Sequence, residues 1–394
     1  MSTLTQARPA TGHRAPARLL SLPLAVTFLA EFTSLTSFFL LLSVMPMLAA
    51  AAGASSSGAG LITGSLLLGT VAAEAAAATG IRRFGYRAML AAGAVLLGAP
   101  ALALLPSEPQ AVMMSVSFVR GLGFGLCGVT TGALIATLLP PGRRGEGLGL
   151  LGIVAGVPAV VALPAGVWLA GHHLGAAVAA MAAAAGLLPL TMIRWLPRRG
   201  EAHSTPAART RRVPGAALRL PLIFAACTIA AGVVDSFLPL AKGVPSNLCS
   251  AALLVQAITA TLSRWQAGRH GDRYGHARLL IPALIVAALG MAAMIWLASP
   301  VLIFASMVLF GAGFGVIENA TLALLIEQLP EAKASARWNL AYDAGYGAGP
   351  AVFGLFAARI GYPAAFALTG SLVLAVLPAA LRERKVVTGT VRPA

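Results

Sequence analysis

The sequence predicts an all-α integral membrane protein with twelve transmembrane helices in two repeats of six. Three observations lead to this prediction. Hydrophobic residues make up 58% of the 394 residues and charged residues only 10%, whereas about 25% of the residues in a soluble domain are charged. Twelve runs are apolar over about the 20 residues that a helix needs to cross a bilayer. Finally, several short motifs recur at one spacing in the two halves of the chain.

The apolar runs have soft edges, and they lack the strand-like alternation of an outer-membrane barrel. Backbone polar groups in lipid have to be satisfied within the segment, which a helix achieves. We therefore expect helices over residues 20–47, 58–80, 88–106, 111–139, 147–170, 174–196, 217–240, 247–267, 277–298, 301–329, 338–358 and 362–381.

The recurring motifs predict a tandem duplication, which is sought before any other assignment. The run Gly121–Gly125 (GLGFG) returns as Gly311–Gly315 (GAGFG), at an offset of 190 (311 minus 121). Further on, Pro164 matches Pro350 at an offset of 186, as one small deletion would produce. We predict an N-terminal six-helix bundle over residues 1–196, a cytoplasmic basic linker over 197–216 and a C-terminal six-helix bundle over 217–394.

Basic residues predict the orientation in the membrane. Of the 28 lysines and arginines, 25 fall in the termini or at loops on one side of the spans, and only Lys242 and Arg359 fall on the other side. Loops rich in Lys and Arg stay in the cytoplasm. Both termini are therefore expected in the cytoplasm, and the expected location is the bacterial inner membrane. Because the net charge of +16 lies in these short gaps with few aromatics alongside, we expect no nucleic-acid partner.

The sequence indicates neither a metal site nor a bound cofactor. The cysteines Cys127, Cys227 and Cys249 lie within apolar runs without the spacing of metal ligands, so we expect them to be buried packing residues. The phosphate-binding Gly-x-x-x-x-Gly-Lys-Ser/Thr loop of ATP-driven proteins is missing. The expected energy source is the proton gradient.

A basic, glycine-rich stretch separates the eighth and ninth apolar runs. Its pattern is formed by Gly268, Asp272, Arg273, Gly275 and Arg278. This pattern resembles the loop signature of the major facilitator superfamily, which joins the second and third helices of each six-helix half. The resemblance implies that fold and a transporter, and the approach to the motif is similar to that of bacterial efflux branches.

In the family, this signature locks the two halves together on the cytoplasmic side when the transporter faces outward. Its Asp meets the N-terminal end of a helix in the other half, where the helix dipole favours an anion. The second copy is complete. The first copy keeps Arg83, Gly85 and Arg87 but has Arg82 in the Asp position, so whether it still acts as a gate stays open.

Six ionisable residues lie within the predicted spans, where a charge costs a few kcal/mol. They are Glu31, Glu74, Arg120, Asp235, Glu318 and Asp343. The interiors of the third, sixth, ninth and twelfth spans hold no charge. In the resembled fold those helices lie on the outside, while helices 1, 4, 7 and 10, which carry four of the six charges, line the central cavity.

Two carboxyl groups are the first candidates for proton coupling. We hypothesise that Glu31 and Glu318 hold the exchangeable proton, and that Arg120 sets their affinity or pairs with an anionic group of the substrate. Arg120 and Glu318 are expected near the midplane, where repeat-built transporters place their sites. The alternative is a static ion pair that holds the halves together.

The remaining polar candidates lie toward the two ends of their spans. Asp235 is closer to the outer end and fits an outer gate, while Asp343 is near the inner end of the eleventh span. Asn319 is included because it follows Glu318. Glu74 and Arg264 occupy equivalent positions in the two repeats, where a structural role and a coupling role are both open.

Glycines and prolines within two spans predict close packing or bending. The fifth span contains Gly156, Pro158 and Pro164, and the eleventh contains Gly349 and Pro350. The fifth span resembles only loosely the Gly-Pro-rich motif of exporters in the superfamily. Ordinary packing of membrane helices explains these residues as well.

The function that the sequence favours is export of a small polar or charged solute, such as a metabolite, a drug or a siderophore-like compound, by proton antiport. Alternatives are a proton-coupled uptake symporter or a facilitator and, more remotely, a non-transporting sensor or scaffold. The scattered histidines and acids form no catalytic constellation, so an enzyme is not expected. The expected partners are a small-molecule substrate, protons and the lipid bilayer, and the expected state is a monomer.

Overall fold

The computed structural model describes residues 20–104, 109–139, 144–198 and 215–389, which are almost entirely helical. The prediction of an all-α membrane protein is therefore confirmed. The helices are α1 (Leu22–Leu42), α2 (Val44–Ala51), α3 (Ser56–Gly98), α4 (Gln110–Leu138), α5 (Arg144–Gly171), α6 (Gly175–Leu187), α7 (Pro189–Met192), α8 (Ala216–Phe237), α9 (Ser246–Tyr274), α10 (Leu280–Ala293), α11 (Pro300–Gln328), α12 (Glu331–Ile360), α13 (Tyr362–Ala375) and α14 (Leu377–Gly389), with short 3-10 turns at Ala99–Ala103, Ile193–Trp195, Leu238–Leu240, His276–Arg278 and Met294–Trp296.

Ten of the described helical segments are long and apolar enough to cross a membrane. One of them, Ser56–Ala103, spans 48 residues and is broken at Gly85, where the backbone leaves the helical region. The 30-residue α12 is not among the ten, because its charged residues lower its mean hydropathy. The number of twelve spans and the cytoplasmic orientation of the termini stay predictions.

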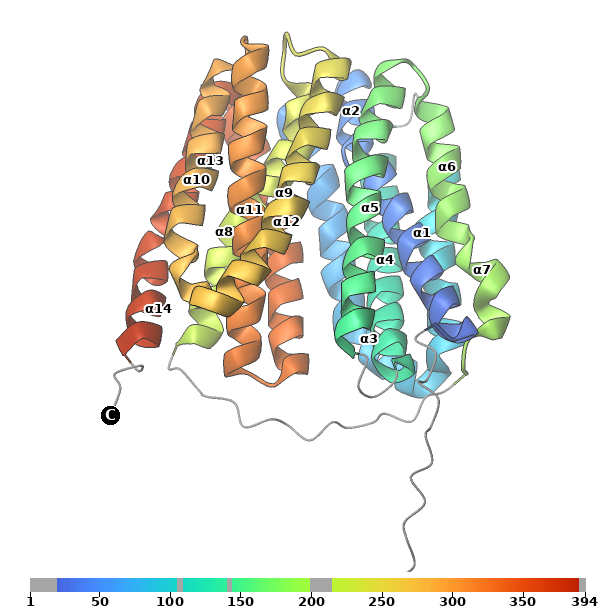
Figure 1. The fold of residues 1–394 in the computed structure, drawn as a ribbon. Helices are drawn as coiled ribbons and strands as arrows, with labels where there is room; N and C mark the ends of the chain where they lie inside the picture. The colour runs from blue at the N-terminus through green and yellow to red at the C-terminus, as the bar shows by residue number, and fades with distance from the viewer. Residues whose placement is uncertain (1–19, 105–108, 140–143, 199–214, 390–394) are drawn as a thin grey trace, which may run out of the picture.

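The helices form two bundles that stand side by side (Figure 1). The N-terminal half consists of α1 to α7 and the C-terminal half of α8 to α14. The halves meet mainly where α3 packs against α12 and where α5 packs against α9. We call the end of the molecule where α1 begins and α14 ends the linker end, at the bottom of Figure 1. The predicted linker itself lies mostly outside the described residues, and the predicted division into domains stays a prediction.

The two copies of the loop signature share a backbone conformation. Gly85 has φ 82° and Gly275 has φ 89°. Side chains disfavour this region by about 1–2 kcal/mol, so glycine is the residue that turns the chain sharply here at the same point of each repeat. The shared conformation supports the duplication that the motif spacing predicts.

The duplicated glycine runs are explained by matching helix contacts. A Cβ atom added to Gly123 would lie 2.7 Å from the carbonyl oxygen of Gly93, and one added to Gly313 would lie 2.5 Å from that of Ala283. Gly93 and Ala283 are themselves equivalent, because their numbers differ by the same offset as the glycine runs. In both halves, therefore, the glycine run lets the fourth helix of the repeat pack backbone to backbone on the third.

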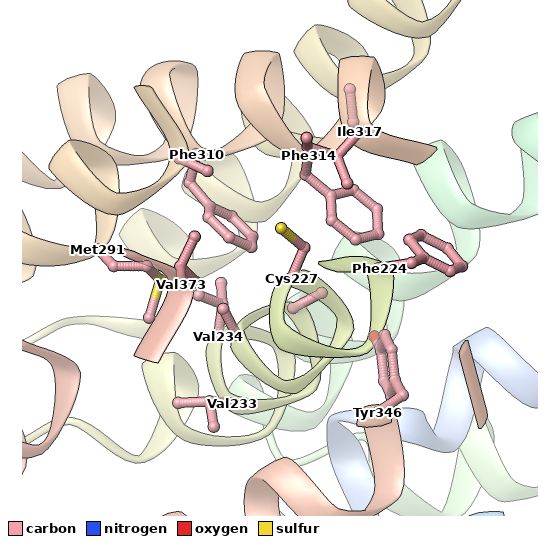
Figure 2. Close-up of a cluster of buried hydrophobic side chains, with 14 of the residues drawn as sticks. Phe224, Cys227, Val233, Val234, Met291, Phe310, Phe314, Ile317, Tyr346 and Val373 are labelled. Carbon is pink, nitrogen blue, oxygen red and sulfur yellow. The ribbon is translucent and has the colours of Figure 1, made fainter. Parts of the chain in front are cut away.

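A continuous apolar core fills the C-terminal half and reaches into the N-terminal half. Around α8, Phe224, Cys227 and Val234 interlock with Phe310 and Phe314 of α11 (Figure 2). All three cysteines are buried and free, which confirms their predicted role as packing residues.

The hydrogen bonds between the halves that involve hydroxyl groups lie away from the linker end. Ser57 Oγ donates to Gly354 O (3.3 Å), and Ser250 Oγ donates to Pro164 O (2.7 Å). The hydroxyl groups of Ser56 and Tyr362 are 3.2 Å apart, and those of Thr63 and Ser236 are 3.0 Å apart. These contacts close the end of the interface that lies opposite the linker end.

Candidate functional site

Arg120 is anchored inside the N-terminal half. Its guanidinium donates to Leu97 O (2.6 Å) at the end of α3 and to Ser37 O (2.8 Å) of α1, and the side chain is 2% exposed. A third contact reaches Ser37 Oγ at 3.4 Å. Buried polar groups require partners, and here carbonyl dipoles supply them. Arg120 also borders a small pocket with Thr63 and Ser117, so its predicted contact with substrate stays a prediction.

Glu31 lies on α1 and is hydrogen-bonded to Thr131 of α4. The same hydroxyl oxygen is 2.9 Å from Cys127 O. A hydroxyl carries one hydrogen, so it can donate to only one of these two acceptors. When Glu31 is ionised, Thr131 donates to the carboxylate. When Glu31 is protonated, the carboxyl donates to Thr131, which then donates to Cys127 O.

Glu318 lies on α11 and forms an ion pair with Arg264 of α9, at 2.8 Å from Nη1 to Oε1. The side chains are 14% and 42% exposed, respectively. The basic partner of Glu318 is therefore Arg264, from the position that matches Glu74 in the other repeat. Next to this pair, the Oδ1 atom of Asn319 is buried without a hydrogen-bond partner among the described residues.

Asp235 lies near the end of α8, and one of its oxygens accepts a hydrogen bond from the hydroxyl of Tyr346 on α12. The residue is 6% exposed. Its Oδ1 atom has no partner within the described part of the chain. A buried carboxyl with an unused oxygen is expensive unless it carries a proton or receives a ligand.

Glu74 of α3 and Asp343 of α12 bring two carboxyl groups close enough to interact across the interface between the halves. Asp343 is 5% exposed, and Glu74 is partly exposed. Two carboxylates cannot accept a hydrogen bond from each other, so the contact requires one proton. Along α3, Glu74 lies further toward the linker end than Ser56, Ser57 and Thr63, which make the other polar contacts between the halves.

Aromatic side chains follow one another along one face of α12. Trp338, Tyr342 and Tyr346 follow one another at helical spacing, with centroids 6.0 and 5.4 Å apart. Phe224 of α8 stacks on Trp338 at 4.4 Å. Trp338 Nε1 also donates to Thr321 Oγ1 of α11 (3.3 Å). Trp338 and Tyr342 are half-buried.

The complete loop signature makes no described contact with the other half. Asp272 is 79% exposed, and its Oδ1 atom lies 3.9 Å from Nε2 of His276. Arg273 and Arg278 are also exposed, while Gly268 packs near Asn319. The exposure of Asp272 fits a lock that is open in this structure.

The degraded copy ties the N-terminal half together instead. Arg87 Nε donates to Leu196 O (2.6 Å), and Nη2 donates to Arg194 O (2.9 Å). The guanidinium of Arg83 lies over the Phe84 ring at 5.2 Å. Arg87 therefore holds α3 against the end of the sixth predicted span, which is a contact within one half.

The predicted hinge residues fall into two groups. Pro158 and Pro164 lie inside α5, and a Cβ atom on Gly156 would meet no atom within 4 Å. Gly349 and Pro350 lie in α12, where Gly349 packs against Ile229 O of α8 and Pro350 O packs against Gly60 of α3. Gly349 and Pro350 thus allow α12 to pack closely against α8 within its own half and against α3 of the other half. Bending at either pair stays a prediction.

Several polar partners were missed by the sequence reasoning. Tyr346 and Thr131 lie in apolar runs, and only their contacts mark them. Glu383 is fully buried and bonds Arg219 (2.7 Å) and Gln328 (2.9 Å), which joins α14 to α8 and α11. A glutamate beside the basic C-terminal tail reads as a solvated charge, so no pattern in the sequence distinguishes it.

Known structures share this fold. A POT family transporter in complex with 5-aminolevulinic acid matches with a TM-score of 0.74 and 12% identity, over 92% of this chain and 96% of the other. A bacterial homolog of the human lysosomal transporter Spinster, in an inward-facing conformation, gives 0.71 and 13% over 93% and 96%. The inward-open xylose transporter XylE from E. coli gives 0.70 and 17% over 90% and 95%.

No curated protein sequence matches the chain. The family profile of the Major Facilitator Superfamily matches residues 27–336. This match covers most of the chain, agrees with the structural neighbours and confirms the resemblance of the loop signature, while the efflux branch stays a prediction. The protein is a transporter rather than an enzyme, and it belongs to the Major Facilitator Superfamily.

Proposed function

We propose that this transporter exports a small polar or charged solute in exchange for protons, through alternating access. The observation that supports proton coupling most directly is the contact between Glu74 and Asp343. It joins the two halves at the interface that has to rearrange when access alternates, and it depends on a single proton.

The carboxyl pair couples protonation to conformation by simple electrostatics. With one proton, the pair adds a hydrogen bond between α3 and α12. Without it, two negative charges face each other at a site where Asp343 is 5% exposed, and like charges in a poorly hydrated site repel strongly. Loss of the proton therefore favours separation of α3 from α12 at the level of Glu74 and Asp343.

Two further acids fit the same scheme. Glu31 exchanges a proton through the hydroxyl of Thr131 without moving a helix. Asp235 keeps one oxygen without a partner among the described residues, while Tyr346 bonds the other. These sites lie on α1 and α8, the first helices of the two repeats, and so give each half its own titratable group.

The proposed solute is polar or charged because charged side chains and half-buried aromatic faces lie close together. The ion pair of Arg264 with Glu318 is adjacent to Asn319, and Thr321 on the same helix bonds Trp338. Aromatic faces of this kind pack against the apolar parts of a solute, whereas the ion pair and the amide fit its polar groups. Export rather than uptake is favoured by the loose exporter-like motif of α5 and by the approach to the loop signature, which is similar to that of bacterial efflux branches.

The test is transport in inside-out vesicles that contain a pH dye, with an acidic interior and pooled candidate solutes. In the wild type, solute should release protons from the vesicles. Asp343→Asn and Glu74→Gln should lose this proton release. Glu327→Gln is the matched control, because Glu327 is a 56% exposed acid beside His276, and it should keep proton release.

Each other outcome identifies a different function. Proton movement in the same direction as the solute would show a symporter. Solute movement without proton movement in the wild type would show a facilitator. Proton release that persists in both pair variants would exclude the pair as the coupling site and leave Glu31, Asp235 and Glu318 to be neutralised next.

A further inference from the structure

The outer surface of α9 forms a shallow groove at the linker end. It is lined by Trp265, Gln266, Arg269, His270, Arg273 and Tyr274. All six residues are exposed. Trp265, Arg269 and Arg273 occupy the side of α9 that points away from Ala260, Ala267 and Gly271, whose buried side faces the bundle. The groove is therefore open to the surroundings of the protein rather than to its interior.

The lining combines positive charge with ordered aromatic rings. The guanidinium of Arg269 lies 4.8 Å from the centre of the Trp265 ring, a cation–π contact. One turn further, the centroids of the His270 and Tyr274 rings lie 4.5 Å apart, with the ring planes tilted by 40°. Arg269 and Arg273 are both exposed, so their guanidinium hydrogens are available to an anion. Arginine forks match the geometry of phosphate oxygens.

The same face of α9 becomes apolar toward the membrane centre. Leu254, Ile258 and Leu262 are 37%, 39% and 53% exposed and follow one another at four-residue spacing. From Ile258 to Arg269 the helix rises by about 16 Å, at about 1.5 Å per residue. Half of the hydrocarbon thickness of a bilayer is about 15 Å. This face therefore presents an apolar strip, then a ring layer, then positive charge, in the order of the parts of a phospholipid.

Other Arg–aromatic pairs mark the same level of the molecule. The described chain contains three cation–π contacts, formed by Arg83 with Phe84, Arg194 with Trp195, and Arg269 with Trp265. All three lie near the linker end. Trp and Tyr concentrate where hydrocarbon meets headgroups, so this level is the expected height of a membrane surface. Of these three pairs, the α9 pair is the one that lines the groove described above.

We propose that this groove binds the headgroup phosphate of an anionic phospholipid from the leaflet at the linker end, with an acyl chain along Leu262 and Ile258. Arg269 and Arg273 contact the phosphate, and Trp265 lies at the level of the glycerol backbone. The acidic neighbour Asp272 is not part of the lining, and it points toward His276. The proposal does not depend on the direction of transport or on proton coupling.

The test is lipid binding by native mass spectrometry of the full-length protein. The protein is released from detergent micelles that contain the neutral lipid phosphatidylcholine, and it is titrated with phosphatidylglycerol. The variants are Arg269→Gln and Trp265→Leu, with Arg337→Gln as the matched control. Arg337 is exposed, lies near the linker end on α12 and carries the same charge, but it is not in the groove. Thermal denaturation verifies that each variant is folded.

The expected result is a saturable phosphatidylglycerol site whose affinity falls about fivefold in Arg269→Gln, as expected for one basic residue near an anionic surface. Arg337→Gln should leave the affinity unchanged. Trp265→Leu should weaken binding while conserving the net charge. Equal losses in Arg269→Gln and Arg337→Gln would overturn the proposal, because they would show diffuse attraction.

A second arm separates lipid from a soluble anion. Glycerol 3-phosphate at millimolar concentration should not displace phosphatidylglycerol, since it lacks the acyl chain that follows Leu262 and Ile258. Complete displacement by glycerol 3-phosphate or by inorganic phosphate would overturn the lipid assignment in favour of a soluble anion site. Equal retention of phosphatidylcholine and phosphatidylglycerol would overturn the charge argument.

Discussion

The two halves share a frame but place their polar groups differently. Arg120 in the N-terminal half corresponds to Phe310 in the C-terminal half, because 310 minus 120 gives the repeat offset. Both are fully buried on the fourth helix of their repeat. Arg120 binds carbonyl oxygens of α1 and α3, while Phe310 packs in the apolar core (Figure 2). The same position of the repeat thus holds a buried charge in one half and a buried aromatic ring in the other. The charge needs backbone acceptors, and the ring needs apolar contacts.

A second equivalent pair shows where the functions of the halves diverge. Thr131 and Thr321 are related by the same repeat offset. Thr131 contacts the carboxyl of Glu31, whereas Thr321 accepts a hydrogen bond from Trp338. In the N-terminal half the threonine therefore contacts a proton acceptor. In the C-terminal half the equivalent threonine contacts an aromatic side chain. At this pair of positions we therefore propose proton handling for Thr131 and solute contact for Thr321.

The largest expected effect comes from removing the buried arginine. Arg120→Met should lower the free energy of unfolding by about 3 kcal/mol or more, because it removes two hydrogen bonds from a charged donor, each of which contributes about 1.5–3 kcal/mol. Phe310→Met should cost less than about 1.5 kcal/mol, as a change of similar volume. Thermal denaturation in detergent measures both. Similar losses in the two variants would contradict the different roles of this shared position.

Helix packing should respond alike in both halves. Gly123→Ala and Gly313→Ala should each cost about 1–3 kcal/mol, because the new methyl group would press on a backbone carbonyl. Gly128→Ala is the control, since a Cβ atom there meets nothing within 4 Å. The same denaturation assay applies. A large loss in only one half would show that the repeats pack differently despite their common spacing.

The equivalent threonines should separate coupling from affinity. Thr131→Val should reduce solute-driven proton release roughly tenfold, because a hydrogen bond to a charged group contributes about 1.5–3 kcal/mol. Thr321→Val should instead raise the KM for solute, with the ratio of protons to solute unchanged. The vesicle assay gives both quantities. If Thr321→Val changed the ratio and Thr131→Val did not, the division of labour would be reversed.

The smallest loss of stability is expected from changes in the loop signatures. Gly85→Ala and Gly275→Ala should each cost about 1–2 kcal/mol, since both positions have positive φ, 82° and 89°. Gly243→Ala tests the same strain outside the signature, at φ 81°. Comparable losses at all three sites are expected in denaturation curves. A loss confined to Gly275 would indicate that the degraded copy no longer needs its turn.

The repeat spacing explains why so much of the fold could be predicted. It located Gly85 with Gly275 and Gly123 with Gly313, because backbone turns and close helix contacts demand particular residues at fixed positions. Partners of buried charges could not be predicted in this way. Arg120 binds carbonyl oxygens, which every residue possesses, so no residue type marks them. Arg264 was identified as the equivalent of Glu74 but not as the partner of Glu318.

The contact of Glu74 with Asp343 shows a second limit. The two residues come from different halves, and their meeting depends on how α3 and α12 are rotated against each other. Periodicity along one helix carries no information on that rotation. Moreover, the repeat offset changes from 190 to 186 between Pro330 and Pro350, and neither offset relates Asp343 to an acidic residue.

The Thr131 hydroxyl bears on the order of two steps, the protonation of Glu31 and the movement of the halves. Its oxygen lies within reach of both Glu31 and Cys127 O, so a change of protonation at Glu31 requires only rotation about one C–O bond. Hydroxyl rotation is far faster than the microsecond-to-millisecond rocking of domains. Arrival of a proton and movement of the halves should therefore be separate phases. Time-resolved infrared spectroscopy would register the carboxyl band before any change in the amide bands.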